Sequence, residues 1–585
     1  MSMRNLTSAF STTKTPQNQA IPGTDQVPNS AGGFSWAVDQ WTQLDRFLIL
    51  GTEGGSYYAS APKLTADNAK SALGCVKADG VRTVNRLVEI SDAGRAPKNT
   101  PALFVLAMAL KLGDADTKRA AQAALPKIAR IGTHLFQLAD AIRAFGGWGR
   151  GTKRSFGNWY TDRVNQESLN RVLADDSLTN DEKEAAHRMI QLAGPRSLAY
   201  QAVKYQSRDG WSHRDVLRLA KPKGFNPGDG GTGDVLKWIT KGWDAVPTEV
   251  PTQDDPTRII WAFEKAKAIG AEQDGKPSKA RTKDLIKLIV DYGLPRECIP
   301  TQYLNEVSVW DALLTSGRGM PFTAMIRNLP KMTASGLLAP MSDASGFVVK
   351  RLMDEEGLKK ARVHPLQVLV ALNTYKGGKG IRGSLTWNPV SQIVDALDRA
   401  FYLSFGAVES TGKRWCLGLD VSGSMGWGQI AGLPGITPMV GSAAMAMVTA
   451  ATEPQHVFTA FSHKLVPVNG LSPRMRLDSV VAQLSQIPMG GTDCALPMLW
   501  ALENKVPVDT FAVYTDSETW FGSVHPKQAL DQYRQKMGID ARLIVVGMTA
   551  NNFTIADPND AGMLDVVGFD TAAPNIMASF AKGEF

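Results

Sequence analysis

Between about Phe34 and Phe405, apolar residues recur at the three- and four-residue spacing of an amphipathic α-helix. Two such faces consist of Leu103, Leu106, Ala107 and Leu110, and of Leu304, Val307, Trp310 and Leu314. Helices of roughly one to two dozen residues, separated by Gly, Pro and Asp loops, favour paired helices stacked as a solenoid. Because no fixed sequence repeat accompanies the pattern, an irregular all-helical domain remains the alternative.

The two ends of the chain follow other patterns. Residues 1–33 are rich in Ser, Thr, Gln, Asn, Pro and Gly without periodicity, which predicts a flexible N-terminal arm. After about Ser410, short continuous apolar runs alternate with helical spans. The apolar runs include residues 511–514 and 543–546, and the helical spans include Pro438–Thr452 and Pro526–Met537. Strands buried on both faces and alternating with helices predict a doubly wound α/β domain over residues 411–585.

Oxygen-bearing side chains follow the apolar run at residues 415–419. The run ends in Asp420, and Ser422 and Ser424 come next in a Gly-containing loop. A buried strand that ends at an acidic residue places the carboxylate at the carboxyl edge of the sheet, where open α/β folds bind ligands. The spacing lets the three side-chain oxygens converge. Such a set suits a divalent cation, Mg²⁺ above all, because Mg²⁺ keeps part of its water shell and takes few protein oxygens.

Two later segments complete this pattern. The turn at residues 490–493 presents the hydroxyl of Thr492, and the apolar run at residues 511–515 ends in Asp516. The order Asp-x-Ser-x-Ser, then Thr, then Asp after a strand resembles the metal-ion-dependent adhesion site of von Willebrand factor A (vWA) domains. The predicted ligands of a divalent metal ion are therefore Asp420, Ser422, Ser424, Thr492 and Asp516. Ordinary turn chemistry is the alternative.

The residue types at this loop disfavour three enzyme classes. A phosphate-binding P-loop needs Lys-Ser or Lys-Thr after its glycines, and residues 423–428 contain no lysine. An aspartyl-nucleophile phosphatase would have an acid at Ser422. A nuclease using Asp420 and Asp516 would have too few carboxylates for a two-metal hydrolytic site. We therefore expect binding and no catalysis.

Composition adds bounds on domain number and compartment. At 585 residues the chain is too long for a single core, so two or more domains are expected. The net charge is only +8, with a pI near 9.1, so a basic face must come from local clustering. Four cysteines without Cys-x-x-Cys spacing argue against a disulfide framework or a zinc site. No apolar stretch is long enough to span a membrane, and a cytoplasmic protein is expected.

Cations, aromatic residues and glycines gather in three runs of the helical region, at residues 145–154, 204–214 and 320–329. Cations neutralise phosphates while aromatic rings stack on bases, which is the combination expected for single-stranded nucleic acid. The alternative is a solvated Lys and Arg face with Trp residues in the core. Trp148 lies in a glycine loop, where a core role for the ring is harder to explain.

Several segments, in order, resemble the Ro ribonucleoprotein family, whose characteristic domain is TROVE (telomerase, Ro and vault). They are residues 44–58, 94–98, 147–150, 204–215, 323–328 and 361–365. The resemblance covers nearly the whole chain from about Gly33. It assigns residues 34–405 to a TROVE domain and residues 411–585 to a vWA-like domain. It also implies that the helices form a ring of HEAT-like repeats, which the periodicity alone does not imply.

The resemblance further implies a function. Family members bind small Y RNAs on the outer surface of the ring, and the positive centre of the ring accepts single-stranded 3′ ends of misfolded noncoding RNA. Bacterial members act with exoribonucleases, and the Ro protein itself has no established catalytic activity. The expected partners are therefore Y or Y-like RNA, misfolded RNA 3′ ends, and polynucleotide phosphorylase or another exoribonuclease. No membrane partner and a protein monomer are expected.

The family's basic RNA contacts map onto Lys204 and Arg208. A family histidine maps onto Lys221, which keeps a cation and loses a ring that can stack on a base. With the basic and aromatic runs, the RNA-binding candidates are Lys204, Arg208, Lys221, His213, Arg214, Trp148 and Arg150. The alternative function is a metal-dependent protein-binding adaptor that acts through the vWA-like domain, with RNA binding secondary.

We expect the double substitution Lys204→Ala and Arg208→Ala to weaken RNA binding regardless of RNA sequence, because phosphate contacts carry no sequence information. Each lost single-strand phosphate contact reduces the slope of log K against log salt concentration by about 0.7. Binding titrations at several salt concentrations measure that slope. An unchanged slope would remove both residues from the interface.

Overall fold

The structure is a computed structural model. It describes residues 14–51, 61–161, 177–179, 183, 194–222, 231–242, 249–253, 255–271, 277–317, 319–381, 383–406, 408–433 and 435–584. Residues 1–13 of the predicted arm and residues 52–58 of the first family-like segment lie outside this set. No helix in the described part of the chain is long and apolar enough to cross a membrane.

Helices make up the region between residues 40 and 403. Its labelled helices are α2 (Gln40–Leu50), α3 (Ala61–Ala78), α4 (Gly80–Asp92), α5 (Thr100–Leu112), α6 (Ala115–Ile128), α7 (Gly132–Ala144), α8 (Arg150–Thr161), α11 (His213–Ala220), α12 (Thr232–Lys241), α13 (Arg258–Ala271), α14 (Lys279–Tyr292), α15 (Val307–Thr315), α16 (Phe322–Ala334), α17 (Asp343–Leu352), α18 (Glu355–Lys360), α19 (Pro365–Lys376) and α20 (Ser391–Leu403). Residues 194–204 are also helical. Two short strands, β3 (Ser207–Arg208) and β4 (Trp211–Ser212), form a hairpin before α11.

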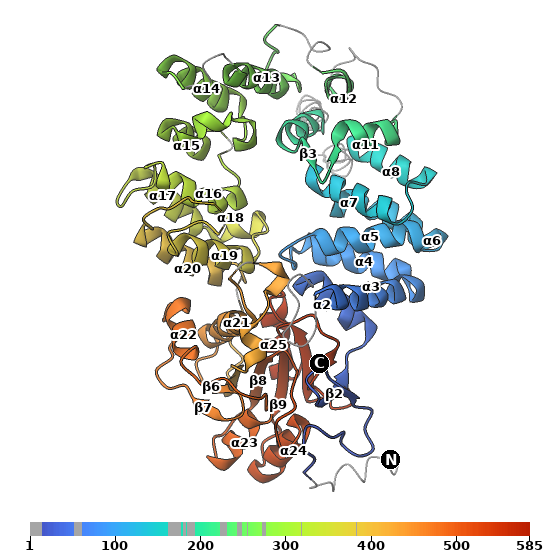
Figure 1. Cartoon of the computed structure of the whole chain (residues 1–585), viewed down its shortest axis with the longest axis vertical. Coiled ribbons are helices and arrows are strands. Elements are labelled where there is room, and N and C mark those ends of the chain that lie inside the picture. The colour runs from blue at the N-terminus through green and yellow to red at the C-terminus, as the bar shows by residue number, and fades with distance from the viewer. Residues whose placement is uncertain are drawn as a thin grey trace.

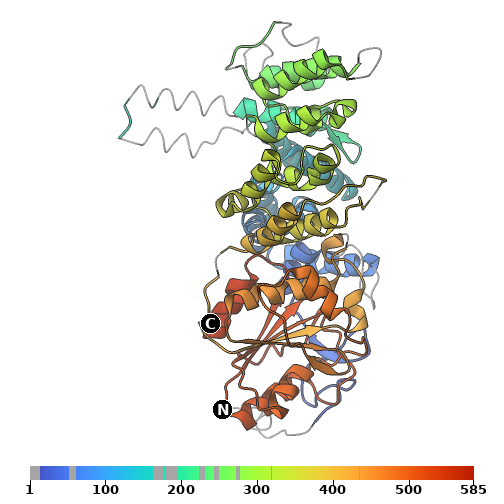
Figure 2. The same ribbon diagram turned by 90° about the vertical axis from the view of Figure 1, so that its left-hand side faces the viewer.

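The helices stand on the C-terminal domain in two columns. One column rises from α2 to α12, and the other descends from α13 to α20, so that the two face each other across the centre of a ring (Figure 1). The view turned by 90° shows the same helices as stacked layers above the sheet (Figure 2). This HEAT-like ring confirms the helical-repeat architecture that the family resemblance implied.

One of the two predicted apolar helix faces is fully buried, and the other is buried only in part. Leu103, Leu106, Ala107 and Leu110 are all buried on α5. Leu304, Trp310 and Leu314 are buried as well, but Val307 is exposed, so its predicted core position is wrong. Val307 is the first residue of α15, and Leu304 belongs to the preceding 3-10 turn, Thr301–Asn305. The face therefore changes where the helix begins.

The C-terminal domain is the predicted doubly wound α/β fold. Its strands are β5 (Trp415–Asp420), β6 (His456–Phe461), β7 (Leu465–Pro467), β8 (Thr510–Thr515), β9 (Arg542–Gly547) and β11 (Met563–Val567). They form a sheet in the order β11-β9-β8-β5-β6-β7, in which only the β6–β7 pair is antiparallel. The surrounding helices are α21 (Pro438–Thr452), α22 (Leu477–Leu484), α23 (Leu496–Glu503), α24 (Pro526–Met537) and α25 (Ala573–Lys582).

Alternate residues of the central strands enter two separate cores. Ala512 and Tyr514 of β8 join the core that contains α21, α25 and the helical ring, whereas Phe511 and Val513 join a smaller core that contains residues of α23 and α24. Because successive strand side chains point to opposite faces and both faces are covered, each central strand has to be apolar almost throughout. This explains the continuous apolar runs in the sequence.

Residues 14–33 are ordered against the C-terminal domain, so the prediction of a flexible arm is wrong for them. The buried Gln17 donates from Nε2 to Asp493 Oδ1 and to the carbonyl of Val524, both at 2.7 Å. Strand β2 (Phe34–Ala37) pairs with β1 (Val27–Pro28) on one side and with β10 (Phe553–Thr554) on the other. The polar composition of residues 14–33 does not reveal these contacts, because the residues that they contact lie near the other end of the chain.

A buried arginine joins the first labelled helix to the last strand of the sheet. Arg46 of α2 is 1% exposed, and its Nη2 donates to Asp565 Oδ1 and Oδ2 of β11 at 2.7 and 2.8 Å. Its Nη1 donates to the carbonyls of Asn551 and Phe553, both at 2.8 Å. A buried guanidinium needs several acceptors, here two carbonyls and a carboxylate, to offset its lost hydration. The pair therefore fixes α2 on β11.

A second junction connects both ends of the helical ring to the C-terminal domain. Arg95, after α4, pairs with Asp570 through Nε at 2.9 Å and Nη2 at 2.5 Å. The Arg95 carbonyl accepts from Nε2 of His364 at 3.1 Å, while Nδ1 of His364 accepts from the backbone N–H of Leu366. Burial lowers the pKa of His364 to about 4, so the ring stays neutral and can serve in both roles. Three distant parts of the chain thus meet at one point.

We expect Arg46→Met to reduce the free energy of unfolding by about 3–5 kcal/mol, because Asp565, which is only 12% exposed, loses its cation. Denaturant unfolding and the thermal midpoint measure the loss. Adding Asp565→Asn should recover part of it, since the second change removes the unpaired charge.

The matched control is Arg119→Met, which removes an exposed arginine paired with Asp116 on α6. Exposed ion pairs contribute at most about 1 kcal/mol. Equal losses in the Arg46 and Arg119 variants would contradict the assigned role of Arg46.

Candidate functional site

The five predicted metal ligands come together at the carboxyl edge of the sheet. Asp420 is the last residue of β5, and Asp516 follows the end of β8, its neighbour in the sheet. Ser422 and Ser424 lie in the loop after β5, and Thr492 lies in the loop before α23. All five side chains are buried.

Hydrogen bonds connect four of these five residues, Asp420, Ser422, Ser424 and Asp516. Asp420 accepts from the backbone N–H of Ser422 at 2.9 Å and from the hydroxyl of Thr515 at 2.6 Å. The hydroxyls of Ser422 and Ser424 are 3.0 Å apart, and Ser424 also bonds to Asp516. Thr492 Oγ1 is buried and has no hydrogen-bond partner among the described residues. The lone pairs of this oxygen are therefore available to a bound ion.

The electrostatics of the group favour a cation. Burial, with the charge of Asp516 as the second cause, raises the pKa of Asp420 to about 7, and burial also raises the pKa of Asp516. Glu518, which sequence reasoning missed, has its pKa raised to about 8 by burial and by Asp516. No Lys or Arg forms an ion pair with these three carboxylates in the described part of the chain.

The donor set fits a hard divalent ion. The described residues contain no cluster of three or more His, Cys, Asp or Glu side chains suited to a metal, so the hydroxyls of Ser422, Ser424 and Thr492 would have to share the coordination. Mg²⁺ prefers a site that offers few protein oxygens and lets the ion keep part of its water shell. The metal would supply a positive centre that can bind an anionic oxygen from outside.

The second group of candidates lies around the β3–β4 hairpin and α11. Arg208 is exposed beside the hairpin turn, where Asp209 and Gly210 both have positive φ, as a two-residue hairpin turn of this kind requires. Arg214 and Lys221 are exposed at the two ends of α11. Arg150 is exposed at the start of α8.

Arg218 extends this basic surface, although it was not among the candidates. Arg214 and Arg218 of α11 are four residues apart, the spacing that places side chains on one helical face, and Lys221 follows as the left-handed C-cap of the helix. All three are exposed. This spacing is visible in the sequence, and it could have identified Arg218 as a further RNA-binding candidate.

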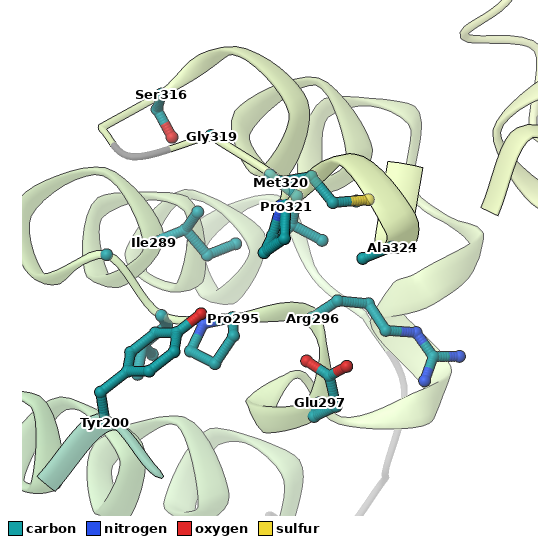
Figure 3. Close-up of a pocket in the computed structure, with 13 residues that line it drawn as sticks. Tyr200, Ile289, Pro295, Arg296, Glu297, Ser316, Gly319, Met320, Pro321 and Ala324 are labelled. Carbon is teal, nitrogen blue, oxygen red and sulfur yellow. The ribbon is translucent and has the colours of Figure 1, made fainter. Parts of the chain in front are cut away.

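Lys204 is half-buried and held between two tyrosines. Its Nζ lies 5.4 Å from the Tyr200 ring and 5.3 Å from the Tyr205 ring, and it donates to the Tyr200 hydroxyl at 3.3 Å. Tyr200 borders a pocket of about 30 Å³, in which its ring lies beside Pro295 (Figure 3). This pocket has room for about two water molecules, so it does not accept a base. The tyrosines instead fix the position of the ammonium group.

Two candidates are placed differently from the expectation. His213 is 3% exposed, and its Nδ1 is 2.9 Å from the Tyr160 hydroxyl, so it is a core residue and not a surface contact. Trp148 is half-buried against Phe156 and Trp211, with ring centroids 4.1 and 6.0 Å apart. Its glycine loop therefore folds the ring back onto the helices, as the core alternative stated.

Comparisons with known proteins agree with both halves of this architecture. Residues 27–289 and 294–376 match the TROVE domain family, and residues 414–581 match the Ro60 vWA domain family. The RNA-binding protein RO60 of Deinococcus radiodurans is 40% identical over 585 residues, covering all of both chains. The chain belongs to the Ro family. The RNA-binding protein RO60 of Caenorhabditis elegans is 33% identical, covering 96% of this chain and 90% of its own.

A solved structure extends the Ro assignment to three dimensions. The crystal structure of the Deinococcus radiodurans Ro (RSR) protein matches with a TM-score of 0.63, covering 94% of this chain and all of that one. At 40% identity, this match supports the whole arrangement of helical ring and vWA domain.

We expect Mg²⁺ to raise the thermal midpoint of the wild-type protein and not that of Asp420→Asn. At a metal concentration one hundred times Kd, binding adds about 2.7 kcal/mol. Without metal, Asp420→Asn should be at least as stable as the wild type, because it removes the charge of one of three buried carboxylates.

Asp540→Asn, an exposed position before β9, is the matched control and should keep the full response to Mg²⁺. The same shift in Asp420→Asn and the wild type would place the metal elsewhere.

Proposed function

We propose that this protein is the RNA-binding scaffold of a Ro ribonucleoprotein. It binds Y or Y-like small RNA together with single-stranded 3′ ends of misfolded noncoding RNA. The bound RNA is passed to a partner exoribonuclease, such as polynucleotide phosphorylase, for maturation or decay, and the scaffold itself catalyses no reaction. The observation that carries the proposal is the exposed basic face of Arg208, Arg214 and Lys221, in a chain whose relatives are named RNA-binding proteins.

The form of this basic face supports single-strand and backbone recognition. Its cations project from a tight hairpin and a short helix, and the aromatic rings beneath, including Trp211, are buried. Contacts of this kind bind phosphates and carry little sequence information. A scaffold that receives many different defective RNAs requires that property.

A second candidate function is protein binding through the metal site. Three large apolar side chains around it are more than half exposed: Trp427 at 64%, Met489 at 53% and Phe521 at 51%. Each is close in sequence to one of the three ligand-bearing loops. A Cβ on Gly426 would lie 3.5 Å from Met489, and one on Gly491 would lie 2.9 Å from Phe521, so the loops are adjacent. This rim suits a partner carboxylate flanked by apolar side chains.

The deciding experiment compares a duplex RNA that has a single-stranded 3′ tail with the same duplex made blunt, at several salt concentrations. We expect strong preference for the tail, because the proposal places a single-stranded 3′ end at the ring and a blunt duplex offers none. Equal or negligible binding to both would overturn the proposal and favour the adaptor. Protein partners that co-purify after nuclease treatment, and are lost in Asp420→Ala, would point the same way.

A further inference from the structure

A cavity of about 360 Å³ lies between α6, α8 and the helical segment at residues 194–204. Its lining consists of Gln122, Ala123, Pro126, Arg130, Ser155, Asn158, Trp159 and Ser197. In Figure 1, α6 and α8 form the outer side of their column, whereas the β3–β4 hairpin is on the side of the ring centre. The cavity shares no residue with either candidate site.

The size of this cavity is that of a ligand site. Pockets that hold small molecules have volumes of roughly 300–1,000 Å³. The pocket beside Tyr200 is more than ten times smaller, at about 30 Å³ against 360 Å³. The cavity between α6 and α8 therefore has room for a molecule as large as a nucleotide.

The charge of the lining favours an anion. Arg130 is the single charged residue of the lining, and it has no carboxylate within ion-pair distance in the part of the chain that the structure describes. Its Nη1 donates to the carbonyl and hydroxyl of Ser91, at 3.0 and 2.6 Å, which fixes the guanidinium. Asp92, whose charge acts on Arg130, is itself paired with Arg362 at 3.7 Å. Burial and then the charge of Arg362 lower the pKa of Arg130, although a guanidinium stays charged in proteins.

The remaining lining offers groups that pair with a nucleobase. Gln122 and Asn158 bring amides with both donors and acceptors, and Ser155 brings a hydroxyl. Pro126 lies inside α6 and has no N–H, so the carbonyl of Gln122 lacks its usual helical donor. Trp159 borders the cavity at a fixed position, although it is only 3% exposed, because its Nε1 donates to the carbonyl of Ala129. These features suit a planar polar ring.

We propose that this cavity binds a phosphorylated nucleoside, with the phosphate at Arg130 and the base at the amides of Gln122 and Asn158 beside Trp159. The same chemistry is presented by a free mononucleotide and by one nucleotide unit of a bound RNA. The RNA source rests on the proposed function, whereas the free mononucleotide does not.

Calorimetric titration of the full chain with 5′-AMP, 5′-UMP and adenosine tests the site. Arg130→Gln should weaken both mononucleotides about 10- to 100-fold, which is the effect of one hydrogen bond to a charged group, and should change adenosine binding little. Ala123→Phe should abolish all binding, because Ala123 is exposed on α6 and a larger side chain there fills the cavity without removing a hydrogen bond. Arg119→Gln, an exposed charge on the same helix, should have no effect.

A titration with a single-stranded RNA octamer distinguishes the two sources. Loss of octamer affinity in Ala123→Phe identifies an RNA unit as the ligand, and loss of mononucleotide binding alone identifies a free nucleotide. The proposal is overturned if the wild type binds no mononucleotide and Ala123→Phe binds the octamer as well as the wild type does. Equal weakening by Arg119→Gln and Arg130→Gln would also overturn it, since binding would then follow net charge alone. A wild-type chain that bound mononucleotides and no octamer would count against the proposed function and leave the cavity assignment standing.

Discussion

The guanidinium of Arg46 can be buried only if the C-terminal domain surrounds it. Its acceptors are the carboxylate of Asp565 and the carbonyls of Asn551 and Phe553, and no residue of the helical ring supplies a substitute among these contacts. An unpaired buried cation costs several kcal/mol, so the helical ring and the vWA domain are thermodynamically coupled. Arg95 repeats the arrangement with Asp570. These two arginines fix the first helices of the ring on the vWA domain, and Lys376 with Asp478 and Arg476 with Asp395 join the other column to it.

Much of the architecture was predictable because its signals are local. Helix α21 begins and ends where predicted, since Thr437 caps it and Pro438 occupies its first position. The closure of the helices into a ring could not be predicted in this way. Helical periodicity says which face is apolar but not which distant helix covers it, so closure came only from the family resemblance. Residues 14–33 escaped prediction for the same reason, because the hydrogen bonds of Gln17 lead to Asp493 and Val524.

The candidate sites show the same division. Asp420 and Asp516 could be assigned from sequence because neighbouring parallel strands must end at one edge of the sheet. The burial of His213 could not, because it depends on the packing of Trp159 and Tyr160 from another helix. Trp148 was misjudged on similar grounds: glycine content indicates a loop but does not say whether the loop turns outward or back onto the core.

The pairing of β2 with β10 gives the chain the connectivity of a closed loop, and this has a consequence for its synthesis. The acceptors of Arg46 lie 505 residues further along the chain. At ribosomal rates of about 5–20 residues per second, the first segments leave the ribosome roughly 25–100 s before their partners exist. During that interval β2 has an open edge, and α2 carries a cation with nowhere to be buried. A messenger truncated before the codons of β10 would therefore yield a helical array that lacks the acceptors of Arg46 and has a strand near its beginning with one open edge.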